Sequence, residues 1–230
     1  MHQITQVSSS YDCYAQLSFN GPLHSGLLLA ARWHHGHFRD TTADLPASLP
    51  YLSQLLATAA IALDHGASED EAIAALLHSA PTDGPQQSKQ NQEALRGEML
   101  NQFGLRVTVL VDDLTGMRQA TALRQINSLS ASSLLMVAAD HLAHNRYLLS
   151  ELLQLPAEQR QDYFAHLGSA ALATLRHQQA VADQLAASPA VSERPRLISL
   201  LQQLSQSVDA LALACGIDPE QLREGPPFNL

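Results

Sequence analysis

Residues 50–78 read PYLSQLLATAAIALDHGASEDEAIAALLH, and this stretch decides the fold. Apolar residues recur at helical spacing over residues 50–65 and again over 69–78, which predicts two helices. Gly66 stands where the first helix would end, because glycine is the usual residue after a helix C-terminus. The segment therefore predicts a helical hairpin.

Both ends of the second helix carry polar side chains. Ser68 and Glu71 have the spacing of a capping box, in which each side chain bonds to the backbone amide of the other residue. His78 ends the helix and Ser79 follows it. Taken alone, His78 could simply be a cap that interacts with the negative end of the helix dipole.

Helical periodicity continues through most of the chain. The further predicted helices span residues 24–35, 86–103, 119–129, 131–153, 157–187 and 195–215. Residues 105–113, LRVTVLVDD, alternate like a strand. Because no other segment offers that strand a partner, we expect a buried helix or an extended connector there. The sequence predicts an all-α fold.

The histidine-rich part of the chain ends near residue 155, which suggests two parts. We predict a helical domain over residues 1–155 and a C-terminal helical extension over 156–230 that packs on it. Apolar residues of the extension recur at helical spacing and could pack on the domain or form a homodimer face. They are Leu167, Ala170, Leu175, Leu197, Leu201, Leu204, Val208 and Leu211.

Charge and composition exclude several classes of partner. The net charge is −9, and Lys89 is the only lysine among 230 residues. The arginines are scattered, so there is no basic stripe for nucleic acid and no basic amphipathic stretch for a membrane surface. No apolar run approaches the ~20 residues that span a bilayer. The N-terminus has no signal-peptide pattern and Cys13 lies far from Cys215, so we expect a reduced, cytoplasmic protein.

Two groups of polar residues are candidates for a site. One is HHGH at residues 34–37, which could also be a solvated helix end. The other contains Asp140, inside the apolar helix predicted over 131–153. A buried carboxylate needs a cation, several hydrogen-bond donors or a metal. A structural salt bridge and a metal ligand are equally compatible with Asp140.

The order of these segments resembles the HD-domain superfamily of metal-dependent phosphohydrolases. A histidine in ARWHHGHFR (31–39) comes first, the hairpin ending at His78 follows, and VAADHLAHNRYLL (137–149) comes last. Within the superfamily it resembles especially the bacterial branch that is similar to the hydrolase domain of (p)ppGpp synthetase/hydrolases, over roughly residues 24–155. The resemblance implies an HD-domain-like helical bundle.

Members of this superfamily bind one divalent metal through two histidines and two aspartates. By position the ligands here are His34, His78, Ser79 and Asp140, so the resemblance implies that serine has replaced one aspartate. Two imidazoles and one carboxylate suit Mn, Fe or Zn, and losing a carboxylate should make binding weak. His144 lies four residues after Asp140 on the same helix face and could substitute as a ligand.

The family's catalytic residues are also changed. Its Glu-Asp pair, which directs the attacking water, reads Thr82 and Asp83 here, so the glutamate is missing. Its substrate-binding basic pair reads Arg39 and Asp40, which reverses one charge.

Other family positions are mixed. Tyr51 and Arg146 match substrate-binding positions, whereas Gln54 stands where the family has a histidine. We expect a non-catalytic module that keeps the helical cleft and binds a small phosphorylated ligand or a protein partner. The acidic net charge disfavours a highly phosphorylated ligand. The alternative is a divergent metal-dependent phosphohydrolase that acts on a nucleotide or another phosphate ester.

Overall fold

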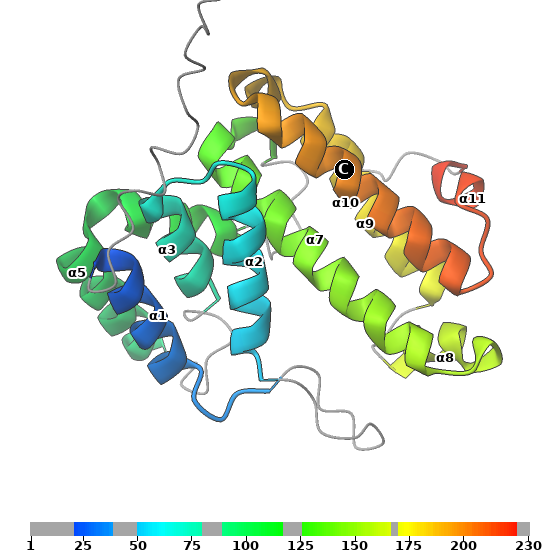
Figure 1. The fold of residues 1–230 in the computed structure, drawn as a ribbon, viewed down its shortest axis with the longest axis horizontal. Helices are drawn as coiled ribbons and strands as arrows, with labels where there is room; N and C mark the ends of the chain where they lie inside the picture. The colour runs from blue at the N-terminus through cyan, green and yellow to red at the C-terminus, as the bar shows by residue number, and fades with distance from the viewer. Residues whose placement is uncertain (1–20, 39–49, 80–88, 117–125, 167–169, 225–230) are drawn as a thin grey trace, which may run out of the picture.

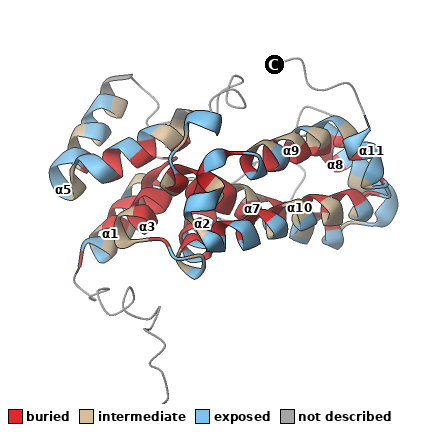
Figure 2. Cartoon of the chain, turned by 90° about the horizontal axis from the view of Figure 1, so that it is seen from above, coloured by how far each residue is buried: buried red, intermediate tan, exposed pale blue. Residues whose placement is uncertain are grey.

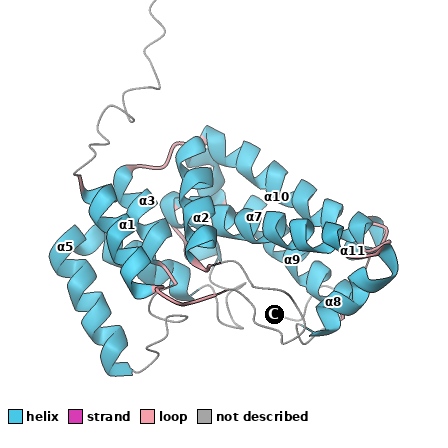
Figure 3. Cartoon of the chain, turned by 60° about the horizontal axis from the view of Figure 1, so that its bottom comes forward, coloured by secondary structure: helices cyan, strands magenta, loops and turns pink. Residues whose placement is uncertain are grey.

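The computed structural model describes residues 21–38, 50–79, 89–116, 126–166 and 170–224. These residues form helices joined by turns, and none of them belongs to a β-strand (Figure 3). One isolated antiparallel bridge joins Phe38 to Pro50. The all-α prediction is confirmed. No helix in these ranges is long and apolar enough to cross a membrane.

The helical elements follow the predicted order (Figure 1). They are α1 (Pro22–Trp33), α2 (Leu52–Asp64), α3 (Glu69–Leu77), α5 (Lys89–Gly116), α7 (Ala131–Gln154), α8 (Arg160–His166), α9 (Ala171–Ala186), α10 (Pro195–Ala214) and α11 (Glu220–Arg223), with short 3-10 turns at Ile126–Ser128, Ala157–Gln159 and Pro189–Glu193.

Helix α7 is the central element. It packs against α2, α3 and α5 and also against α9 and α10, so it joins the two predicted parts of the chain. In Figure 1, α1, α2, α3 and α5 gather around one end of α7, and α8 and α11 lie at the other end. The buried faces of these helices turn inward (Figure 2).

The apolar core has two clusters that meet at a polar layer. The first cluster takes residues from α1, α2, α3, α5 and half of α7, and also from α9 and α10. The second lies around Leu148 at the other end of α7. Asn145, Gln178 and Ser207 stand between the two clusters along α7, α9 and α10, and the Asn145 amide donates to Ser207 Oγ at 2.9 Å. The extension thus shares the first cluster, and the division at residue 155 stays a prediction.

Residues 105–113 form a helix, so the extended connector is wrong. Helix α5 is interrupted at Gly104, whose φ of 82° lies in the left-handed region. After it, Val107, Leu110, Val111 and Leu114 are buried at spacings of three and four residues. Val109, which completes the apparent strand alternation, is 45% exposed.

The predicted helix over residues 157–187 is divided into a 3-10 turn, α8 and α9. Helix α8 ends at His166 and α9 begins at Ala171. Ala170, the residue before α9, is extended with φ −67° and ψ 142°, and residues 167–169 lie outside the described residues. Of the predicted helix over 119–129, residues 119–125 lie outside the described residues, and 126–128 form a 3-10 turn.

The apolar stripe of the extension mostly packs inside the chain. Its buried members are Leu175, Leu197, Leu201, Leu204, Val208 and Leu211. Ala170 is exposed and Leu167 lies outside the described residues. Intramolecular packing accounts for this stripe, and the homodimer stays a prediction.

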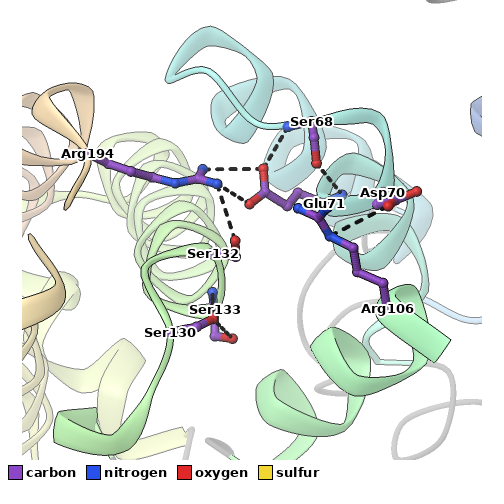
Figure 4. A network of polar contacts seen from close by, with 8 residues as sticks. All are labelled: Ser68, Asp70, Glu71, Arg106, Ser130, Ser132, Ser133 and Arg194. Atoms are coloured by element: carbon purple, nitrogen blue, oxygen red, sulfur yellow. Dashed lines mark hydrogen bonds and ion pairs between the residues drawn. The ribbon is translucent and has the colours of Figure 1, made fainter.

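A buried ion pair ties the extension to the hairpin (Figure 4). Glu71 is fully buried and completes the predicted capping box, accepting from the Ser68 amide at 2.6 Å. Arg194, just before α10, donates to both carboxylate oxygens of Glu71 and to Ser132 Oγ on α7. Residues 123 positions apart are thereby joined.

We expect Arg194→Met to destabilise the protein by about 3 kcal/mol, because it leaves the Glu71 carboxylate buried without its cation. Urea unfolding measures this loss. Arg96→Met is the control, since Arg96 forms an exposed ion pair with Asp112 and should change stability little. Equal effects of the two substitutions would contradict this role of Arg194.

Acid should weaken the ion pair between Glu71 and Arg194. Burial raises the pKa of Glu71, but hydrogen bonds from Ser132, Arg194 and Ser68 outweigh it, and the net pKa lies below the ordinary value of 4.5. A carboxyl group with a lowered pKa contributes stability above its ordinary pKa and loses it as the pH falls through the lowered value. The stability difference between wild type and Glu71→Gln should be constant near neutrality and shrink below about pH 4.5. A difference that does not change in acid would refute this prediction.

Candidate functional site

The ends of α1 and α3 lie side by side because the two helices approach closely. A Cβ atom added at Gly26 of α1 would lie 3.1 Å from Ile73 Cγ2 of α3, so only glycine leaves this contact unstrained. His34 follows the last residue of α1, and His78 follows the last residue of α3. The close packing therefore brings both histidines to one end of the helix pair.

Four side chains meet there, and we call them the central cluster: His34, His78, Ser79 and Asp140. His34 Nε2 lies 3.4 Å from Ser79 Oγ, and His78 Nε2 lies 3.5 Å from Asp140 Oδ1. The predicted proximity of Asp140 to His78 is confirmed. The two histidines and Ser79 are buried, while the Asp140 side chain is 21% exposed and connects the cluster to solvent.

His78 has one ring nitrogen engaged and the other orphaned. Its Nδ1–H donates to the Ala75 carbonyl oxygen at 2.8 Å. Nε2 is buried and has no hydrogen-bond partner among the described residues. In the neutral ring Nε2 carries a lone pair and is a hydrogen-bond acceptor. It faces a carboxylate oxygen of Asp140, which is also an acceptor. A cation or a proton between them would relieve this repulsion.

Helix α2 supplies hydrogen-bond donors to the Asp140 carboxylate. The Gln54 amide donates to Asp140 Oδ1 at 2.9 Å and to its backbone oxygen at 3.2 Å. The Thr58 hydroxyl, one turn further along α2, has two acceptors in range, Asp140 Oδ1 at 3.1 Å and the Gln54 carbonyl oxygen at 3.0 Å, and shares its single proton between them. Both of these donors are neutral side chains, and His78 lies beside them. Sequence reasoning missed Thr58, although its spacing of four residues from Gln54 places both on one helix face.

Tyr51 lies next to the central cluster in a group of three rings. Its ring centroid is 5.1 Å from that of His34 and 4.5 Å from that of His37, with the rings nearly parallel. The structure thus brings one predicted substrate-binding residue to a predicted metal ligand. The binding role of Tyr51 itself stays a prediction.

Arg146 belongs to a different contact. Its guanidinium donates to Gln203 of α10 at 3.1 Å. It lies six residues after Asp140, a rotation of about 600° along the helix, so it faces another side of α7. His144 is half-buried and shares the face of Asp140, and its role as a substitute ligand stays a prediction.

Four further predicted residues lie outside the described residues: Arg39, Asp40, Thr82 and Asp83.

The donor set of the central cluster suits a divalent metal only in part. His34, His78 and Asp140 are the ligand types that Mn, Fe and Zn accept, and the Ala75 contact orients His78 as in known metal sites. However, the described residues contain no group of three or more His, Cys, Asp or Glu side chains arranged to hold a metal ion. Close contacts join His34 to Ser79 and His78 to Asp140, and Ser79 contributes a neutral hydroxyl to the cluster.

The sequence model of the HD domain matches residues 28–167, which is more than half of the chain. The chain therefore belongs to the HD domain family, and the resemblance seen in the sequence is confirmed. HD domains generally bind divalent metals.

A solved structure has a similar fold. It belongs to a protein described as a metazoan ortholog of SpoT that hydrolyzes ppGpp and plays a role in starvation responses. The two share 20% sequence identity with a TM-score of 0.54, over 83% of this chain and 97% of the other. At this identity the likeness concerns the fold. No curated protein sequence matches the chain significantly.

The Thr58 contact can be measured by its effect on stability. We expect Thr58→Val to cost about 1.5–3 kcal/mol, because it removes a hydroxyl that donates to a charged group as well as to the Gln54 carbonyl. Thr108→Val is a matched control: Thr108 is equally buried and makes the same contact to a carbonyl four residues back, that of Gly104, and a neutral hydrogen bond is worth about 0.5–1.5 kcal/mol. Denaturant unfolding compares the two. A smaller loss for Thr58→Val than for Thr108→Val would show that Asp140 does not depend on this donor.

Proposed function

We propose that this chain is a non-catalytic HD-domain protein that binds a small phosphorylated ligand beside the central cluster. The observation that carries the proposal is Ser79, a fully buried hydroxyl 3.4 Å from His34 Nε2. The carboxylate that the family has at this position would supply both a metal bond and a negative charge. A neutral hydroxyl supplies neither at comparable strength.

The kind of ligand follows from the family and from the ring group. The resemblance to metal-dependent phosphohydrolases implies a phosphate ester, and the similar solved structure is described as hydrolysing ppGpp. Tyr51 and His37 provide flat ring surfaces beside the cluster, which suit contact with a base or another planar group. The net charge of −9 makes long-range attraction of a phosphorylated ligand weak, so modest affinity is expected.

A metal in this site would be held by His34, His78 and Asp140. When bound, a divalent ion lowers the pKa of a coordinated water and polarises a phosphoryl oxygen. With one carboxylate in place of two, the site keeps less negative charge to offset the ion. We therefore propose weak, exchangeable binding of Mn, Fe or Zn.

The second candidate function is a divergent metal-dependent phosphohydrolase. The orphaned His78 Nε2, buried and 3.5 Å from Asp140 Oδ1, favours it. A buried acceptor aimed at a carboxylate is what a retained metal ligand looks like in the absence of its ion. Residual hydrolysis would then need an additional ligand, and His144 is the candidate.

Calorimetric titration tests whether the chain binds a divalent metal and which metal it prefers. We expect wild type to bind Mn²⁺ or Zn²⁺ weakly and more tightly than Mg²⁺, because two of its three ligands are nitrogens. Ser79→Asp should strengthen Mn²⁺ binding, and His78→Ala should abolish it. Tight Mg²⁺ binding without Mn²⁺ or Zn²⁺ binding would contradict the proposed ligand set.

Hydrolysis assays separate the two candidate functions. We expect no appreciable turnover of ppGpp or common nucleotides by wild type with Mn, Fe, Zn or Mg. Losing one electrostatic catalytic group costs about 2.7–4 kcal/mol in the barrier, and here a metal ligand and the water-directing carboxylate are both changed. The double variant Ser79→Asp/Thr82→Glu tests whether activity can be restored.

The outcomes are distinct. Activity that appears only in the double variant would support a binding protein derived from a hydrolase. Wild-type turnover near ~10 per second, lost in His78→Ala, would overturn the non-catalytic reading in favour of the hydrolase.

A further inference from the structure

His37 is held against His34 by the turn that follows α1. The His37 amide donates to the His34 carbonyl oxygen at 3.0 Å. Gly36, between them, has a φ of 72°, a conformation that L side chains rarely adopt. The turn folds the chain back so that the His37 ring meets the His34 ring through their Nδ1 atoms, with ring centroids 5.3 Å apart and an interplanar angle of 17°.

The start of the hairpin fixes His37 from the other side. The Tyr51 amide donates to the His37 carbonyl oxygen at 2.9 Å, and the Phe38–Pro50 bridge lies next to this bond. The Tyr51 and His37 rings stack at 4.5 Å with an interplanar angle of 8°. Backbone and ring contacts thus both restrict where the His37 ring nitrogens can lie.

The consequence is a contact between two like atoms. His34 Nδ1 and His37 Nδ1 are 3.0 Å apart, a hydrogen-bond distance that requires a single proton between them. If His37 donates, neutral His34 carries its own proton on Nε2 and presents an N–H to Ser79. If His34 donates, its Nε2 keeps a lone pair directed toward Ser79 and the central cluster.

We propose that His37 is a positioning residue that accepts the Nδ1 proton of His34 and so presents the His34 Nε2 lone pair for ligand or cation binding. It does for His34 what the Ala75 carbonyl does for His78, where the Nδ1 proton is likewise donated and Nε2 is left as an acceptor. Both histidines of the central cluster then have the same tautomer. The inference rests on the proposed binding role of His34.

Two substitutions distinguish the effect of the His37 acceptor nitrogen from the effect of its ring stacking on Tyr51. His37→Phe keeps a flat ring against Tyr51 and removes the acceptor nitrogen. His37→Asn keeps an acceptor atom near the Nδ1 position and removes most of the ring. His35→Phe is the matched control, because His35 is an exposed neighbour in the same turn. Thermal unfolding of each variant identifies any loss of folded protein.

The tautomer is measured first, without metal. Nitrogen-15 NMR of the His34 ring, at a pH of about 8.5 where free imidazole is neutral, reports which nitrogen carries the proton. Wild type, His37→Asn and His35→Phe should have His34 protonated on Nδ1, and His37→Phe should shift the proton toward Nε2. A wild-type His34 protonated on Nε2 would overturn the proposal.

Titration with Zn²⁺ gives the second readout. We expect His37→Phe to weaken Zn²⁺ binding about 10–100-fold, as is usual when an orienting partner of a histidine ligand is lost. His37→Asn and His35→Phe should stay close to wild type. A folded His37→Phe with wild-type affinity would overturn the proposal. If wild type binds no metal, the metal part of the proposed function fails, and the NMR result alone decides the role of His37.

Discussion

The carboxylate of Asp140 is the constraint around which the site is built. It projects from α7, the helix that most of the fold packs against, and an unpaired charge there would be costly. Gln54 and Thr58 of α2 donate to it, and His78 at the end of α3 faces it. The relative positions of α2, α3 and α7 are therefore tied to one ionised group as well as to the apolar core.

Under the proposed function, the same arrangement lets an HD-domain scaffold persist without its full metal site. Gln54 and Thr58 stabilise the Asp140 carboxylate with hydrogen bonds from the protein itself. Ser79 can then replace an acidic residue without leaving a buried group unpaired, since its hydroxyl lies within reach of His34. Retention of the helices and loss of ligand charge are compatible because different side chains are responsible for them.

Local signals in the sequence predicted local structure well. The Ser68–Glu71 capping box and the helix end at Gly66 are both present, since each depends on residues a few positions apart. The family order also identified His78 and Asp140 as neighbours. The Glu71–Arg194 pair was not predictable, because a capping glutamate gives no sign of a second partner 123 residues away.

Errors arose where tertiary packing overrides a local pattern. For residues 105–113 the strand-like alternation left a buried helix and an extended connector open, and burial at three- and four-residue spacing confirms the helix. The break between α8 and α9 was missed because apolar periodicity continues across it. Within the site, Thr58 and His37 were not assigned roles, since a threonine in an apolar helix and a histidine in a turn carry no specific signal alone.

The central claim is that Ser79 weakens an inherited metal site formed by His34, His78 and Asp140. Crystals of wild type and of Ser79→Asp, both soaked in Mn²⁺, test it through the anomalous scattering of the metal. The account predicts a strong peak bonded to all three residues in Ser79→Asp and a weak peak at the same position in wild type. Peaks of equal strength in both proteins, or no peak at this position in Ser79→Asp, would contradict it.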